Sequence, residues 1–130
     1  MLKLFRTAYL AIACFIIIHV LTLFPFKSRP DTNFNFFPNI DKVVHFGLFF
    51  MLCFLWGMYI FSKKDLSQKS KNTWAIVLPL LAIIDGISVE FLQKLPAIHR
   101  DFEWFDALAD AVGAITGILF AKFAAKKFWP

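Results

Sequence analysis

Four long runs of apolar residues, each interrupted by few polar side chains, dominate the chain. They lie at residues 7–24, 43–61, 74–92 and 102–121. An α-helix needs about 20 apolar residues to cross the hydrocarbon core of a bilayer, so each run is long enough to span it. The pattern predicts an all-α fold: a compact bundle of four transmembrane helices, with the whole chain, residues 1–130, forming a single membrane domain.

The fourth run is apolar but contains two aspartates. Asp106, Asp110, Gly113 and Gly117 follow one another at spacings of four, three and four residues, which places them on one face of a helix. The two carboxylates are then about 6 Å apart along the helix axis. Because acidic groups inside a membrane are costly, this face is predicted to turn toward protein or a wet cavity.

Further polar residues lie near the ends of the second and third runs. Asp41 and His45 share a face at the start of the second helix, and Glu90 and Gln93 lie at the end of the third. In an up-and-down bundle, these ends meet the start of the fourth helix on one side of the membrane. With one cation from the third loop, they form the candidate ligand-binding set: Asp41, His45, Glu90, Gln93, Arg100, Asp106 and Asp110.

Composition and charge favour a membrane protein and argue against a nucleic-acid-binding one. Hydrophobic residues make up 59% of the chain, more than a soluble domain carries. The net charge of +5 comes from basic residues at the ends of the apolar runs, and these form no basic face. Nine basic residues belong to the termini and the second loop, against five in the first and third loops. The positive-inside rule therefore predicts cytoplasmic termini and an outward-facing candidate set.

The segment between the first two runs, residues 25–42, is rich in proline and phenylalanine. Pro25, Pro30 and Pro38 exclude a long helix, and the phenylalanines make the segment too apolar to extend freely into water. We predict that it lies in the membrane interface and covers the candidate residues.

Each candidate has a structural interpretation beside its functional one. Asp106 and Asp110 can accept a cation or a polar headgroup, or they can be neutralised by Arg100 and only hold the bundle together. His45 can act as a base or ligand oriented by Asp41. Equally, it can be a buried hydrogen-bonding residue, with Asp41 as the helix N-cap.

Metal binding and self-association are also left open by the sequence. Together, His45, Glu90, Asp106 and Asp110 have the composition of a divalent-metal site, but the chain contains no tight ligand motif such as H-E-x-x-H or paired C-x-x-C, so no cofactor is predicted. Gly113 and Gly117 can form an oligomer interface between copies of the chain, although their position beside the aspartates favours packing within one bundle.

Two motifs resemble a known family. The stretch DKVVHF at residues 41–46 resembles the D-K-x-x-H-F helix start of the VanZ-like family of bacterial membrane proteins. The series Glu90, Gln93, Arg100, Asp106 and the two glycines resembles its second signature, E-x-x-Q … R … D-x-x-x-N-x-x-G-x-x-x-G. The chain departs from it at Asp110, where the family usually has Asn. The resemblance implies a multi-pass protein of the bacterial cytoplasmic (inner) membrane, linked through the family's founding member to resistance against a lipid-tailed glycopeptide antibiotic.

Three functions are compatible with these features. The first is recognition of an amphiphilic cell-envelope compound, a lipid headgroup or lipidated glycopeptide, with membrane lipids as neighbours. The second is an intramembrane enzyme acting on a polyprenyl-linked or phospholipid substrate, with grouped carboxylates and His45 as acid and base. The third is a structural or assembly subunit of a membrane complex. Since the sequence presents no recognisable nucleophile, recognition is favoured over catalysis.

Overall fold

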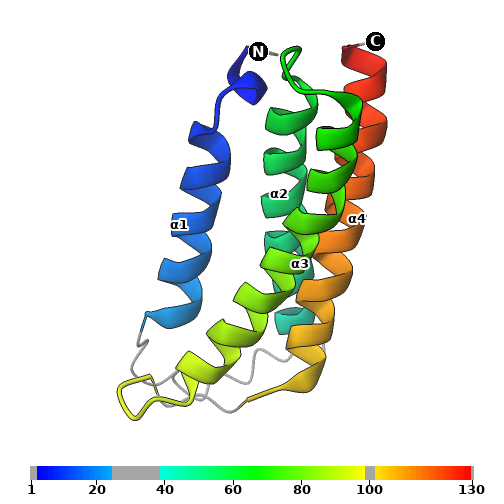
Figure 1. Ribbon diagram of the computed structural model, residues 1–130. Coiled ribbons are helices and arrows are strands. Elements are labelled where there is room, and N and C mark those ends of the chain that lie inside the picture. The colour runs from blue at the N-terminus through cyan, green and yellow to red at the C-terminus, as the bar shows by residue number, and fades with distance from the viewer. Residues whose placement is uncertain (1–2, 25–38, 99–101, 130) are drawn as a thin grey trace.

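Helices account for nearly all of the chain that the structure, a computed structural model, describes: residues 3–24, 39–98 and 102–129. A single 3-10 turn, η1, precedes four α-helices that run up and down (Figure 1). The helices are η1 (Leu4–Arg6), α1 (Tyr9–Leu23), α2 (Ile40–Phe61), α3 (Gln68–Gln93) and α4 (Trp104–Phe128). Both ends of the chain and the α2–α3 connection lie at the same end of the molecule.

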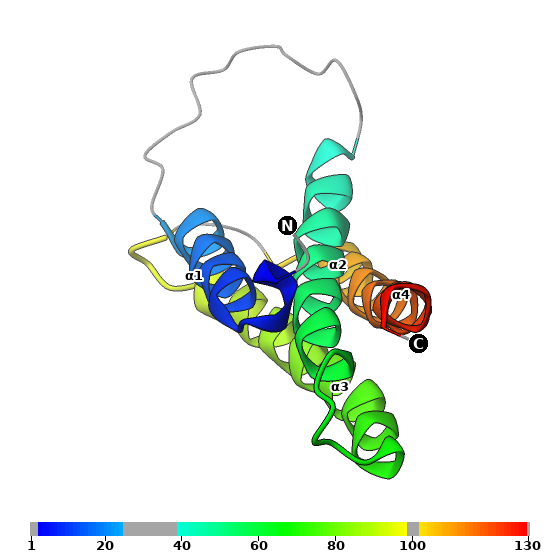
Figure 2. The ribbon, with the colours of Figure 1, turned by 90° about the horizontal axis from the view of Figure 1, so that it is seen from above.

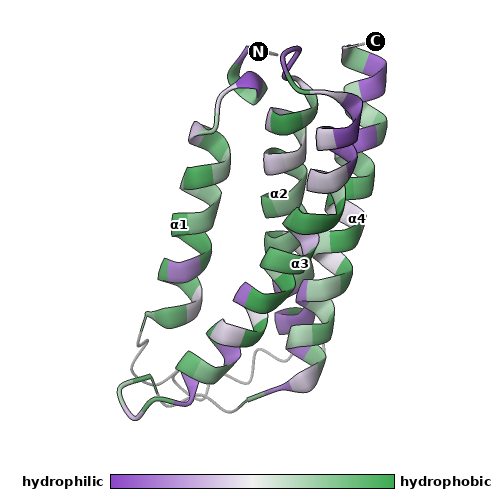
Figure 3. Cartoon of the chain, viewed as in Figure 1, coloured by the Kyte–Doolittle hydropathy of each residue, from purple (hydrophilic) through white to green (hydrophobic). Residues whose placement is uncertain are grey.

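Three of these helices have the length and composition of membrane spans. α2, α3 and α4 contain 22, 26 and 25 residues, so each is about 33 Å long or more and exceeds the roughly 30 Å hydrocarbon core. Their outward faces carry large apolar side chains such as Ile76 and Leu119, and Figure 3 shows that polar residues concentrate near the helix ends. We therefore treat the chain as a membrane protein.

The first predicted span, residues 7–24, forms a shorter helix than expected. The run at residues 7–24 forms a helix of only 15 residues, α1, after η1. This is about 22 Å of helix, less than the hydrocarbon core. α1 still exposes an apolar face, with Ile16, Ile17 and Val20 all more than half exposed. Its crossing of the membrane stays a prediction.

The other helices extend beyond the predicted spans. α3 begins six residues earlier than residue 74, where Ser67 caps the helix by accepting a hydrogen bond from the Ser70 backbone N–H. α4 continues to Phe128 and carries Lys126 and Lys127 in its last turn, where cations are favoured by the helix dipole. α2 already begins at Ile40 after Asn39, so Asp41 lies inside the first turn and is not the N-cap.

α2 and α4 form the tightest pair in the bundle. A Cβ atom at Gly113 would collide with the backbone carbonyl of Phe46, and one at Gly117 with that of Phe50. The two glycines therefore let the helix backbones approach closely, as small residues do in membranes. This face of α4 is covered by α2 within the monomer, and an oligomer through Gly113 and Gly117 stays a prediction.

α1 is the peripheral helix. Within the described residues it contacts α2 and α3 but not α4, and Figure 2 shows it on the far side of the bundle from α4. Two polar contacts hold it against α3. His19 Nε2 lies 3.2 Å from Asp85 Oδ1, and the Gln93 side-chain amide donates to the Thr22 carbonyl at 3.0 Å.

Candidate functional site

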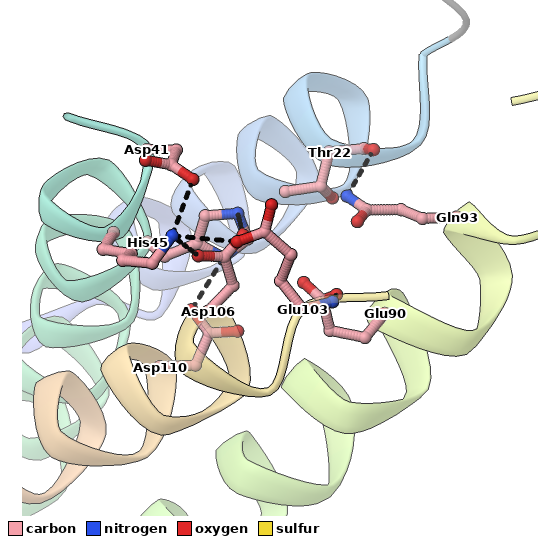
Figure 4. Close-up of polar contacts among 9 residues, drawn as sticks. Thr22, Asp41, His45, Glu90, Gln93, Glu103, Asp106 and Asp110 are labelled. Carbon is pink, nitrogen blue, oxygen red and sulfur yellow. Dashed lines mark hydrogen bonds and ion pairs between the residues drawn. The ribbon is translucent and has the colours of Figure 1, made fainter. Parts of the chain in front are cut away.

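Polar side chains from three helices gather where α2 begins, α3 ends and α4 begins. The buried members of this group, here called the acidic cluster, are His45, Glu90, Asp106 and Asp110, with exposed fractions of 6%, 1%, 8% and 1%. Figure 4 shows them pointing toward one another from α2, α3 and α4. The alternation of the helices brings together residues that lie far apart in the sequence.

His45 is oriented by Asp110. Its Nδ1 atom lies 3.0 Å from Asp110 Oδ1, and its Nε2 atom lies 3.8 Å from Asp106 Oδ2. Of the two interpretations left open by the sequence, the structure agrees with a buried, hydrogen-bonded His45, and the Asp41 carboxylate bonds to Lys42, the next residue, and not to the imidazole. Asp41 and His45 are four residues apart on α2, but α4 packs directly against this face of α2, so His45 bonds to Asp110 of α4.

Glu90 and Asp110 are acids with incomplete hydrogen bonding. Glu90 Oε2 accepts the backbone N–H of Glu103 at 3.1 Å, while Oε1 is buried and has no hydrogen-bond partner among the described residues. Asp110 Oδ2 is likewise buried without such a partner. It lies against Gly86, where a Cβ atom would come within 2.8 Å of it. Unsatisfied buried carboxylate oxygens are costly, so they are candidates for accepting a ligand.

Lys42 is the cation of the site and was missing from the candidate set. Its ammonium lies 3.0 Å from Asp41, 2.9 Å from Glu103 and 3.4 Å from Asp106. Glu103 was missing as well. The sequence signal was available, since Lys42 follows Asp41 at the start of an apolar run and lies inside the DKVVHF stretch. The charge count treats Lys42 as a determinant of topology, and spacing along one helix does not relate it to Glu103 or Asp106.

The remaining candidates take different positions. Gln93 points away from the acidic cluster and joins α3 to α1 through Thr22 (Figure 4). Asp41 lies at the partly exposed rim. Arg100, the predicted partner of the aspartates, lies outside the described residues, as does most of the predicted interfacial segment 25–42. In the described chain, Lys42 and His45 are the basic groups that contact Asp106 and Asp110.

An apolar cavity runs along α1, α2 and α3 from the middle of the bundle toward the α2–α3 connection, where Lys63, Asp65 and Leu66 line it, and no residue of the acidic cluster belongs to its lining. Its volume is about 670 Å³, and its walls include Phe15 of α1, Leu52 and Trp56 of α2, and Ala82 and Asp85 of α3. Asp85 directly precedes Gly86, the residue that packs against Asp110. Helical periodicity does not predict this cavity, because the cavity depends on how α1 packs against α2 and α3.

Two groups of ligand-type side chains are close enough to hold a metal ion. One consists of His45, Glu90 and Asp106, all buried, and the other of Asp41, Glu103 and Asp106 at the rim. The Lys42 ammonium contacts all three members of the second group. The two groups share Asp106, so the buried and rim parts of the site are electrostatically connected.

Comparison with known proteins adds no assignment. No protein-family model matches the chain, and neither the curated proteins nor the solved structures contain a match to it.

Proposed function

We propose that this membrane protein binds an amphiphilic cell-envelope compound. The headgroup would lie at the acidic cluster and the apolar chain in the cavity beside α1. The observation that carries the proposal is that Glu90 and Asp110 each have a buried carboxylate oxygen without a partner among the described residues. An apolar cavity of about 670 Å³ reaches Asp85, the neighbour of Gly86, which packs against Asp110. Ligand sites commonly combine a few convergent polar groups with an apolar lining.

The charge of the site limits the headgroup. Among the described residues, five carboxylates (Asp41, Glu90, Glu103, Asp106 and Asp110) lie in this region, and the cationic or basic groups that contact members of this set are the Lys42 ammonium and the His45 imidazole. A headgroup with amines, amides or several hydroxyls would supply the missing hydrogen-bond donors and positive charge. The positive-inside rule supports a position at the outer leaflet.

The resemblance to the VanZ-like family agrees with this class of ligand. A lipid-tailed glycopeptide has both a donor-rich headgroup and an acyl chain. In addition, the polar contacts of the His45 ring among the described residues are with the carboxylates of Asp106 and Asp110, and include no hydroxyl or thiol that the imidazole could activate. We therefore favour binding over catalysis.

Retention of amphiphiles by the purified protein tests the proposal. The wild type, extracted in mild detergent, should retain cell-envelope amphiphiles that mass spectrometry identifies, and should bind an added lipoglycopeptide. Ala82→Phe fills the cavity, and its matched control, Ala13→Phe, adds the same bulk at an exposed position of α1. We expect at least a tenfold loss of retention for Ala82→Phe and none for the control.

A second pair of variants addresses the headgroup. Asp106→Asn keeps the shape of the side chain but removes its charge, and we expect it to weaken retention, whereas Lys69→Gln on the exposed start of α3 should not. If folded Ala82→Phe and Asp106→Asn proteins both retain amphiphiles as the wild type does, the proposal is wrong. A role restricted to holding the bundle together would then be favoured.

A further inference from the structure

We infer that His45, Glu90 and Asp106 form a binding site for one divalent transition-metal ion of the Zn²⁺ class. One ligand atom from each side chain lies within 4.8 Å of the other two, and all three residues are buried. They come from α2, α3 and α4, respectively, so the three membrane-spanning helices each contribute one ligand. This inference does not depend on the proposed amphiphile.

The orientation of His45 is the one that metal-binding histidines adopt. Ligating histidines usually donate their second ring N–H to a carboxylate, which fixes the ring and leaves the other nitrogen for the metal. Here Nδ1 lies 3.0 Å from Asp110 Oδ1. Because a carboxylate accepts hydrogen bonds, Nδ1–H donates to Asp110, and in the metal-bound state the deprotonated Nε2, which faces Asp106, would be the ligand atom. Asp110 is thus a positioning residue and not a ligand.

A buried oxygen without a partner supports the same site. Glu90 is 1% exposed, and its Oε1 atom has no hydrogen-bond partner within the described part of the chain, although Oε2 is bonded. A metal ion would coordinate this carboxylate and offset two of the negative charges gathered there. The cost of burying unpaired carboxylates would then be reduced, because the cation is itself a buried charge partner.

The pair formed by His45 and Asp106 needs only a small contraction to bind zinc, and the distances to Glu90 are at most 4.8 Å. Two ligands each about 2.1 Å from a tetrahedral zinc ion lie about 3.4 Å apart. His45 Nε2 and Asp106 Oδ2 are 3.8 Å apart. One imidazole and two carboxylates leave a fourth position for water or for a ligand oxygen, as in catalytic and ligand-binding zinc sites. Mg²⁺ and Ca²⁺ prefer all-oxygen ligands, so the imidazole favours a transition metal.

The rim group provides an internal contrast. Asp41, Glu103 and Asp106 are also close enough to hold a metal, but the Lys42 ammonium contacts all three carboxylates. The chain thus supplies that group with an ammonium that contacts each of its carboxylates. Among the described residues, Lys42 contacts the buried group only through Asp106, at 3.4 Å.

Metal analysis of tag-free protein in detergent tests the inference. After loading with ZnCl₂ and removal of excess metal, the wild type should hold one zinc per chain by elemental analysis. Co²⁺ in its place should give the visible absorption of a tetrahedral site, and zinc should raise the midpoint of thermal unfolding. His45→Gln and Glu90→Gln should lose the bound zinc and this thermal shift. Asp110→Asn should weaken zinc affinity roughly 10–100-fold, as expected for the loss of an outer-shell carboxylate.

A variant at the rim is the control for these zinc measurements. Asp41→Asn, at the rim, should bind zinc as the wild type does. Wild-type protein that holds no zinc after loading, or folded His45→Gln and Glu90→Gln proteins that still hold it, would overturn the inference. Amphiphile retention is measured separately in zinc-free and zinc-loaded protein. If the protein retains amphiphiles but binds no zinc, only the metal site is wrong. If it binds zinc but retains no amphiphile, only the proposed function is wrong.

Discussion

The Nδ1 atom of His45 lies 3.0 Å from Oδ1 of Asp110, a residue 65 positions later in the chain. Both side chains are buried. This contact joins α2 to α4 at the point where the glycines of α4 begin to pack against the α2 backbone. The hydrogen bond therefore stabilises the packing of α2 against α4 and also orients the His45 ring in the acidic cluster.

Replacing Asp110 separates these two contributions. Asp110→Leu leaves the His45 N–H buried without an acceptor, which costs about 1–3 kcal/mol. Asp110→Asn keeps an acceptor oxygen in the same place and should cost less. The free energy of unfolding, measured by denaturant titration in mixed micelles, should fall in the order wild type, Asp110→Asn, Asp110→Leu. Equal stability of the two variants would show that the hydrogen bond contributes nothing.

The close approach of α2 and α4 predicts the effect of adding one methyl group. Gly117→Ala places a Cβ atom against the carbonyl of Phe50, which cannot move without shifting α2, so the variant should lose roughly 1–3 kcal/mol of stability. Gly47 is the matched control, since nothing lies within 4 Å of a Cβ atom there. Gly47→Ala should leave the stability unchanged or slightly raise it. The same denaturant titration measures both variants. Equal losses of unfolding free energy in Gly117→Ala and Gly47→Ala would contradict the close packing of α2 and α4.

Removing the ammonium of Lys42 should create a need for another cation. In Lys42→Gln, the carboxylates of Asp41, Glu103 and Asp106 lose their shared partner. We expect a lower midpoint of thermal unfolding, with a smaller loss than for Gly117→Ala because these ion pairs are partly exposed. Millimolar Ca²⁺ should restore the midpoint in this variant and leave Lys69→Gln and the wild type unchanged. Absence of any calcium response would show that the rim carboxylates do not act as a group.

The orientation in the membrane can be measured by cysteine labelling. In a background with Cys14 and Cys53 replaced by alanine, Leu95→Cys in the α3–α4 connection should react with a membrane-impermeant maleimide in intact cells. Lys64→Cys in the α2–α3 connection should react only after permeabilisation. Both positions are exposed, so accessibility does not bias the comparison. The reverse pattern would place the acidic cluster on the cytoplasmic side.

The apolar pattern predicted the helices more successfully than their ends. Runs of apolar residues identified α2, α3 and α4 because the pattern is set by the bilayer, but amphipathic turns at Gln68 and beyond residue 121 extended the helices into sequence that hydropathy excluded. The spacing of Asp110, Gly113 and Gly117 predicted a face turned toward protein, and the structure buries that face against α2.

The partners of the acidic residues could not be predicted in the same way. Helical periodicity relates residues on one helix, so it suggested Asp41 as the partner of His45. The observed partner, Asp110, depends on the rotation of α4 about its axis, which is fixed by the glycines. The contacts of Lys42 with Glu103 and Asp106 depend on the same rotation.

The long separation between His45 and Asp110 also has a consequence for biosynthesis. α2 leaves the ribosome well before α4, so its imidazole and the α3 carboxylate of Glu90 enter the membrane before the helix that completes their environment exists. Polar groups without partners are poorly tolerated in hydrocarbon. The early helices are therefore expected to remain beside the insertion machinery until α4 arrives, and nascent chains that stop after α3 should be preferred substrates of membrane quality-control proteases.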